Sequence, residues 1–319
     1  MTLFRTYCRF LSVVILFISL FRYANGSESV IASGSITSIQ TTSKFRFLTF
    51  LGSYKTNSAL EDDIWNLGLK SSLTNGQVSQ SNFSFQHFQL TEQMKKGPFE
   101  FIVAPGIANR NMENIKSSQI FEGFLGFNSA FETTGLQIEV GSKSYGEELQ
   151  SISSIQENLR GPYYRLAIQK KITEAVKLNL ISKTLYLSDG NQRTDNDLSL
   201  MYGIATSWPW IWVGLGTGYL TNSKANQPYW SPRQFYSYGP RLDIAAPIYR
   251  TFSFAVGLNL NKFQDIDFRQ GQGFYSNSKI VYGEVGKLRY EVGLEAIQSE
   301  QNGNVWRSQA VALGMQCPF

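Results

Sequence analysis

Apolar residues alternate with polar or small ones from Lys44 to the end, in segments of about ten residues, the length of a membrane-spanning β-strand. The segments 252–261 and 288–296 show the alternation most clearly, and 136–141 and 198–204 repeat it. A period of two places the apolar set on one face of a strand and the polar set on the other. The chain is therefore predicted to be all-β.

The composition favours a membrane environment over a soluble sandwich, which would show the same alternation. Aromatic residues make up 14% of the chain, and charged residues only 17%, against about 25% in typical globular domains. After residue 26 no apolar stretch is long enough for a membrane-spanning helix. A bilayer then admits only a closed barrel, whose backbone hydrogen bonds are all internal.

The connections between strands separate the barrel from the sandwich. Long polar links are expected at 299–304, 263–276, 221–233, 188–197, 146–160, 109–118 and 72–80. They alternate with tight links at 284–287, 247–250, 207–209, 171–175, 133–135, 95–97 and 57–62. Outer-membrane barrels have long outer and short periplasmic connections. The pattern predicts a transmembrane antiparallel β-barrel in the cell outer membrane.

The number of strands follows from parity. The pattern from Lys44 onward gives an odd number, whereas bacterial single-chain barrels have an even number with both ends in the periplasm. The weakly patterned segment 30–40 is therefore expected to be a first strand. We predict 16 strands, with 14 as the alternative.

The amino terminus is typical of a secretory signal peptide. Arg5 and Arg9 precede the apolar segment 10–21, and Ala24 and Gly26 provide small residues for cleavage. We expect residues 1–26 to be removed, leaving 27–319 as a single barrel domain.

The carboxy terminus is expected to carry an assembly signal. Val311, Leu313, Met315 and Phe319 are apolar at alternate positions, and the last is a terminal aromatic. This pattern is like the terminal strand that the barrel-assembly machinery recognises. That machinery, outer-membrane lipid and lipopolysaccharide are the expected partners.

The polar face predicts a water-filled lumen, because a barrel of 16 strands is wide enough for an aqueous channel. The residues expected to line it are Arg165, Lys177, Asn179, Arg241, Asp243, Arg289, Glu291 and Glu295. Their signs are mixed, so the sequence does not indicate an ion selectivity. A channel is the favoured function, with an exopolysaccharide as the candidate cargo.

Other functions receive less support. The chain has 29 basic and 24 acidic residues, and Arg5, Arg9 and Arg22 fall in the signal segment, so nucleic-acid binding is not expected. Two cysteines and one histidine argue against a metal site, and no cofactor is predicted. A serine hydrolase would have to use His87, which is in phase with Phe83 and Phe85, a set expected to face lipid. The protein is not expected to be an enzyme. An enzyme acting on lipid or lipopolysaccharide, or a structural or adhesive barrel without an open pore, remains the alternative.

Aromatic residues gather in one of the predicted outer links. The segment of interest contains Tyr229, Trp230, Ser231, Pro232 and Phe235. Its rings could stack on sugar faces, or they could belong to the interfacial aromatic girdle of a barrel. Both interpretations are consistent with the sequence.

This segment also carries a resemblance to a known family. Residues 227–240 (QPYWSPRQFYSYGP) resemble the Y-[FY]-S-P-x-x-[FY] element in the carboxy-terminal barrel of the outer-membrane protein of bacterial cellulose synthase, an exopolysaccharide exporter. In both, a strand with aromatic and glycine residues precedes it, here 210–219. The resemblance covers residues 210–319 and implies a 16-stranded barrel that exports a polysaccharide, with Tyr229, Ser231, Pro232 and Phe235 as a structural element at the outer rim. Trp230 stands where Phe or Tyr is commoner, and the family's tetratricopeptide part has no counterpart in this sequence.

Overall fold

The structure of the chain is a computed structural model. It describes residues 29–41, 45–60, 63–78, 81–113, 115–145, 149, 152–225, 227, 229–249, 251–265, 270–284, 287–301 and 304–318. The predicted signal peptide lies outside these residues. Among them, no helix has the length and apolarity needed to cross a membrane.

The described residues form sixteen strands and one short helix. They are β1 (Ser29–Thr41), β2 (Phe45–Leu60), β3 (Asp63–Val78), β4 (Ser81–Lys96), β5 (Phe99–Met112), β6 (Ile115–Ala130), β7 (Thr134–Ser144), α3 (Ile152–Gln156), β8 (Arg160–Thr173), β9 (Val176–Tyr186), β10 (Gln192–Ala205), β11 (Trp210–Asn222), β12 (Gln234–Tyr249), β13 (Phe252–Asp265), β14 (Gln270–Tyr282), β15 (Arg289–Gln301) and β16 (Asn304–Pro318).

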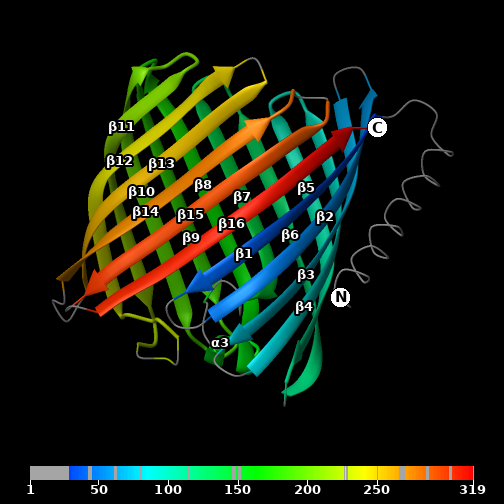
Figure 1. The fold of residues 1–319 in the computed structure, drawn as a ribbon, viewed down its shortest axis with the longest axis vertical. Helices are drawn as coiled ribbons and strands as arrows, with labels where there is room; N and C mark the ends of the chain where they lie inside the picture. The colour runs from blue at the N-terminus through cyan, green and yellow to red at the C-terminus, as the bar shows by residue number, and fades with distance from the viewer. Residues whose placement is uncertain are drawn as a thin grey trace.

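These strands close into one antiparallel barrel. Each strand pairs with its sequence neighbours, and β1 closes the ring by pairing with both β16 and β2 (Figure 1). Ile36 lies opposite Leu313 on one side and Phe50 on the other. The predicted 16-strand barrel is confirmed, the recruitment of 30–40 as a first strand is confirmed, and the alternative of 14 strands is wrong.

The outward face of the barrel is apolar. Phe121 is 77% exposed, and further large exposed apolar residues occur around the wall, including Leu90, Phe101, Leu125, Val140, Leu200, Ile204, Leu215, Leu260, Ile280, Leu294 and Leu313. An apolar surface of this extent is stable only against lipid or a partner. A closed barrel with this outer surface is the architecture of outer-membrane β-barrels, as the sequence predicted.

The expectation for the strand that contains His87 is wrong. Phe83 and Phe85 are only 3% and 2% exposed, whereas Phe88, Leu90 and Met94 of the same strand are exposed. The set with Phe83, Phe85 and His87 therefore lies on the inner face. Alternation alone cannot tell which face is inside when both sets contain aromatic residues, and that is the case in β4.

The connections differ from the prediction in length. β7 and β8 are joined by residues 145–159 and β11 and β12 by 223–233, both at the same end of the barrel. We name this the outer end, because long connections are typical of the outer side. Only residues 302 and 303 separate β15 from β16 there, whereas 283–288 separate β14 from β15 at the periplasmic end. Long links at every outer position were wrongly predicted, because strands extend beyond the lipid, where outward residues no longer need to be apolar.

The β7–β8 connection folds against the inner wall. Its helix α3 lies at the outer end of the barrel (Figure 1). Ile155 in α3 packs with Phe83, Phe85 and Met112 in a buried cluster. A connection that packs against inward-facing wall residues narrows the outer mouth.

Candidate functional site

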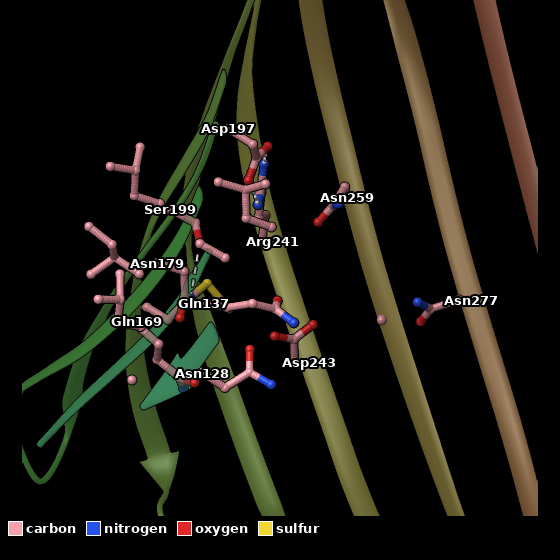
Figure 2. A pocket seen from close by; sticks show the side chains of 18 of the residues that line it. Asn128, Gln137, Gln169, Asn179, Asp197, Ser199, Arg241, Asp243, Asn259 and Asn277 are labelled. Atoms are coloured by element: carbon pink, nitrogen blue, oxygen red, sulfur yellow. Dashed lines mark hydrogen bonds and ion pairs between the residues drawn. The ribbon is translucent and has the colours of Figure 1, made fainter. Parts of the chain in front are cut away.

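The inner wall of the barrel borders an open cavity of about 510 Å³, which many polar side chains line. Most of the polar side chains that line it end in an amide, a carboxylate or a hydroxyl. They come from β6 to β10 and β12 to β14: Asn128, Ser129, Gln137, Gln169, Asn179, Asp197, Ser199, Arg241, Asp243, Asn259, Tyr275 and Asn277. Figure 2 shows the labelled members on neighbouring strands around a common space.

The amides of this cavity are positioned by strand register. Gln137 lies opposite Asn128, Gln169 opposite Asn179, and Asn179 opposite Ser199. Residues directly opposite in an antiparallel pair point to the same face. Asn179 Nδ2 donates to Ser199 Oγ at 3.2 Å. Cross-strand pairing therefore builds two polar groups on the inner wall, one of Asn128 with Gln137 and one of Gln169 with Asn179 and Ser199.

Three residues form the charged part of the cavity: the predicted lumen residues Arg241 and Asp243, and Asp197. Arg241 Nη1 donates to Asp197 Oδ1 at 2.8 Å, and Nη2 donates to Asp197 Oδ2, so the pair is bidentate (Figure 2). Asp243 lies two residues farther along β12 and also lines the cavity. Lys177 is placed over the Trp212 ring, with Nζ 4.2 Å from the ring centroid, and Trp212 lies opposite Asp243.

The structure places the other predicted lumen residues on the same wall. Arg165 Nη1 donates to Gln137 Oε1, and Gln137 lines the cavity. Arg289 and Lys279 both contact the carboxylate of Glu291, at 3.0 and 2.6 Å. Glu295 lies opposite Asn277, which also lines the cavity.

Several lining residues were not singled out from the sequence. Asn128, Gln137, Ser199 and Asn277 are missing from the predicted set, and so is Asp197. Each is the register partner of another inward residue, or is bonded to one. Aligning neighbouring strands in register from the turns that join them would have identified these lining residues.

The rim segment contributes a buried anchor. Tyr229 is 4% exposed and packs in a cluster with Tyr145, Leu159, Tyr163, Leu185 and Leu187. Its hydroxyl donates to Asp189 Oδ2 at 2.7 Å and accepts from Asn191 Nδ2 at 2.8 Å. Burial raises the pKa of the Tyr229 phenol above its ordinary value of 10.0. Tyr229 therefore joins the β9–β10 and β11–β12 connections.

Trp230 differs from its neighbour. It is 55% exposed, and its ring meets Phe235 edge to face with centroids 5.1 Å apart. Phe235 in turn contacts Phe263 at 5.2 Å, and the Arg193 guanidinium lies 5.5 Å from the Trp230 ring centroid. The outer mouth thus presents a half-exposed indole, with the Arg193 guanidinium over its ring and Phe235 against it.

Ser231 and Pro232 hold this segment in place. Ser231 is buried, and its Oγ accepts from the backbone N–H of Gln227 at 2.8 Å. The Pro232 carbonyl accepts from Asn222 Nδ2 at 2.7 Å. These bonds fix the turn that exposes Trp230.

The infolded β7–β8 connection is tied to the wall by an arginine. Arg110 Nη2 donates to the Ile155 carbonyl at 3.1 Å, and Nη1 donates to Asn158 Oδ1. Asn158 Nδ2 donates to Ser118 Oγ at 3.2 Å. This tether was not predicted from the sequence, since its partners lie far apart in the chain.

The predicted assembly signal lies partly within the described residues. Val311, Leu313 and Met315 of β16 are exposed on the outward face. Phe319 lies outside the described residues. The assembly role stays a prediction.

Among the described residues, no group of three or more His, Cys, Asp or Glu side chains is arranged to hold a metal ion. The histidine contacts an acid, with His87 Nδ1 3.1 Å from Glu122 Oε2.

Comparisons with known proteins place the fold. No protein-family model matches the chain, and no curated protein is similar to it in sequence. Among solved structures, the chain is similar to one described as a bacterial polysaccharide outer membrane secretin, with 12% identity, a TM-score of 0.71, and coverage of 92% of this chain and 98% of that chain. OccK11 (OpdR) of Pseudomonas aeruginosa is matched with 7% identity and a TM-score of 0.49, over 92% of this chain and 96% of that chain. At 12% identity, the likeness to the secretin shows a shared 16-stranded barrel fold.

Proposed function

We propose that the protein is an outer-membrane conduit through which a hydrated polysaccharide chain leaves the cell. The observation that carries this proposal is the amide-rich cavity inside a closed barrel whose outer surface is apolar. Amide side chains both donate and accept hydrogen bonds without carrying charge, so they can exchange partners with passing hydroxyls.

The chemistry of the inner wall supports passage rather than tight binding. Its charges are largely paired within the wall, as in Arg241 with Asp197 and Lys279 with Glu291. Because opposite charges lie next to each other, the wall carries no strong net electric field. A neutral chain therefore meets no strongly charged site along the wall.

The rim supports a sugar contact at Trp230. Its exposed indole face is available for stacking, whereas the buried Tyr229 ring anchors the connections. The resemblance of residues 227–240 to the barrel of the cellulose synthase outer-membrane protein and the fold shared with a polysaccharide secretin both support a polysaccharide cargo.

Planar-bilayer recording with oligosaccharides tests the proposal. The purified barrel should give discrete conductance steps, which neutral glucan oligosaccharides interrupt transiently. Asn259→Leu should shorten these interruptions, because it removes an amide from the cavity. The control Leu258→Phe changes the preceding residue on the opposite face of β13 and should leave them unchanged. Steps without sugar interruptions would contradict a sugar conduit.

The enzyme alternative has one observation in its favour. Strand register places Ser72 opposite His87 on the inner wall, and His87 Nδ1 contacts Glu122. Serine, histidine and acid are the groups of a serine hydrolase. None of Ser72, His87 and Glu122 lines the cavity described above. An esterase activity abolished by both Ser72→Ala and His87→Ala, in a barrel without conductance, would favour this alternative.

A further inference from the structure

Arg241 reaches across a whole strand to find its partner. It projects from β12, and Asp197 projects from β10, with β11 between them. The inward positions of β11 that lie beside this path are Gly214, Gly216 and Gly218. The guanidinium therefore lies along the wall instead of projecting into the lumen.

Gly216 is required for this placement. A Cβ built on Gly216 would lie 1.9 Å from Arg241 Nε and 2.4 Å from Cζ. No real Cβ tolerates such contacts, so any other residue at 216 would displace the guanidinium from its present position. A Cβ on Gly218 would meet Ser237 Oγ instead, at 2.6 Å. The hollow beneath Arg241 is thus specific to Gly216.

The pair also sets the charge of the cavity. Arg241 compensates Asp197 bidentately, a geometry that gives strong and directional pairing. Asp243 has a nearby cation in Lys177, with which it interacts electrostatically. The remaining polar lining is mostly amide and hydroxyl. Removing Arg241 would leave Asp197 as an uncompensated carboxylate facing the lumen.

We propose that Arg241, held on the wall by Gly216 and Asp197, keeps the lumen nearly non-selective by balancing the charge of Asp197. This inference rests on the proposed conduit function. With the pair intact, the cavity has little preference between small cations and anions. A lumen carboxylate without its partner attracts cations and repels anions.

Reversal potentials in a potassium chloride gradient test the inference. Arg241→Gln should raise the potassium-to-chloride permeability ratio by about twofold or more. Asp197→Asn should shift the ratio in the opposite direction, and the double variant should return close to wild type. Lys287→Gln is the control: it removes a positive charge from an exposed periplasmic turn, where Lys287 pairs with Glu284, and should leave the ratio nearly unchanged.

Two glycine-to-alanine variants test the position of the Arg241 guanidinium separately from its charge. Gly216→Ala keeps both charges but displaces the guanidinium, so single-channel conductance should fall. Gly293→Ala adds the same methyl group to the inward face of β15, where the nearest atom is 3.7 Å away, and should leave conductance nearly unchanged. Equal conductance in the two variants would overturn the role of Gly216.

The outcomes separate this inference from the proposed function. A folded wild-type barrel without conductance would overturn the conduit and the selectivity role together. A conducting wild type in which Arg241→Gln and Asp197→Asn both keep the wild-type ratio would overturn the role of Arg241 alone. If Arg241→Gln does not fold, Asp197→Asn still decides, since an unchanged ratio in that variant contradicts the inference.

Discussion

The hydroxyl of Tyr229 donates a 2.7 Å hydrogen bond to the carboxylate of Asp189, and this bond joins two outer connections of the barrel. The same hydroxyl accepts from Asn191, which is itself buried. Because the ring is enclosed, the exposed Trp230 beside it is presented at a fixed place on the rim.

Tyr229→Phe should destabilise the barrel without removing the sugar contact. The change removes one hydrogen bond each from Asp189 and Asn191. This should lower the free energy of unfolding by about 1–2 kcal/mol. The loss should appear as a lower temperature for the heat-induced mobility shift on gels. Tyr238→Phe is the matched control, because that tyrosine is exposed on the outward face. Equal stability of the two variants would contradict the anchoring role.

The contribution of Tyr229 to the stability of the folded barrel should depend on pH. Burial raises its pKa in the folded state, so its stabilisation is present below pH 10 and is lost as pH rises above the ordinary value of 10.0 toward the folded pKa. The stability difference between wild type and Tyr229→Phe should therefore persist from pH 7 to about pH 10 and shrink above it. A difference that grows with pH in that range would reverse the assigned sign.

Trp230→Ala should lower polysaccharide release per folded barrel while leaving assembly and small-ion conductance nearly intact. Its ring is open at the mouth and takes no part in the buried cluster around Tyr229. If the ring belongs only to the interfacial girdle, release should fall in proportion to the protein lost. Surface polysaccharide divided by the amount of folded barrel distinguishes the two results.

Arg110→Ala should widen the outer mouth. It removes the bonds that hold Ile155 and Asn158 of the β7–β8 connection on the inner wall. We expect larger and noisier single-channel currents. Arg307→Ala removes an arginine that bonds Gln298 instead, and should keep wild-type currents. Identical currents in both variants would show that the tether does not limit the pore.

Deleting Phe319 should sharply reduce the folded, heat-modifiable form in outer-membrane fractions, because the terminal aromatic is expected to be read during assembly. Phe319→Tyr keeps an aromatic end and should assemble normally. Undiminished assembly of the deletion would rule out the proposed signal.

The sequence predicts the barrel well because lipid imposes a period of two on every membrane-spanning strand. That constraint identifies Leu258 and Leu260 as outward and Asn259 as inward without any structure. Parity adds β1, whose own pattern is weak. The constraint ends where strands leave the lipid, and for this reason the lengths of the outer connections were predicted poorly.

The inner site is less predictable, because contacts between strands that are not adjacent are not encoded in the local pattern. Arg241 could be assigned to the lumen, but its partner Asp197 lies two strands away and depends on a glycine between them. Phe83 and Phe85 were assigned to lipid because aromatic residues usually are. They instead receive the infolded Ile155, a contact set by the long β7–β8 connection.

We propose that the protein is an open, water-filled conduit that accepts a sugar chain. The most direct test records single-channel currents from the purified, folded barrel while neutral glucan oligosaccharides are added to one side. We predict discrete conductance steps with brief interruptions that become more frequent with sugar concentration and longer with chain length. A folded barrel that gives no conductance, or conductance steps that the oligosaccharides never interrupt, would contradict this function.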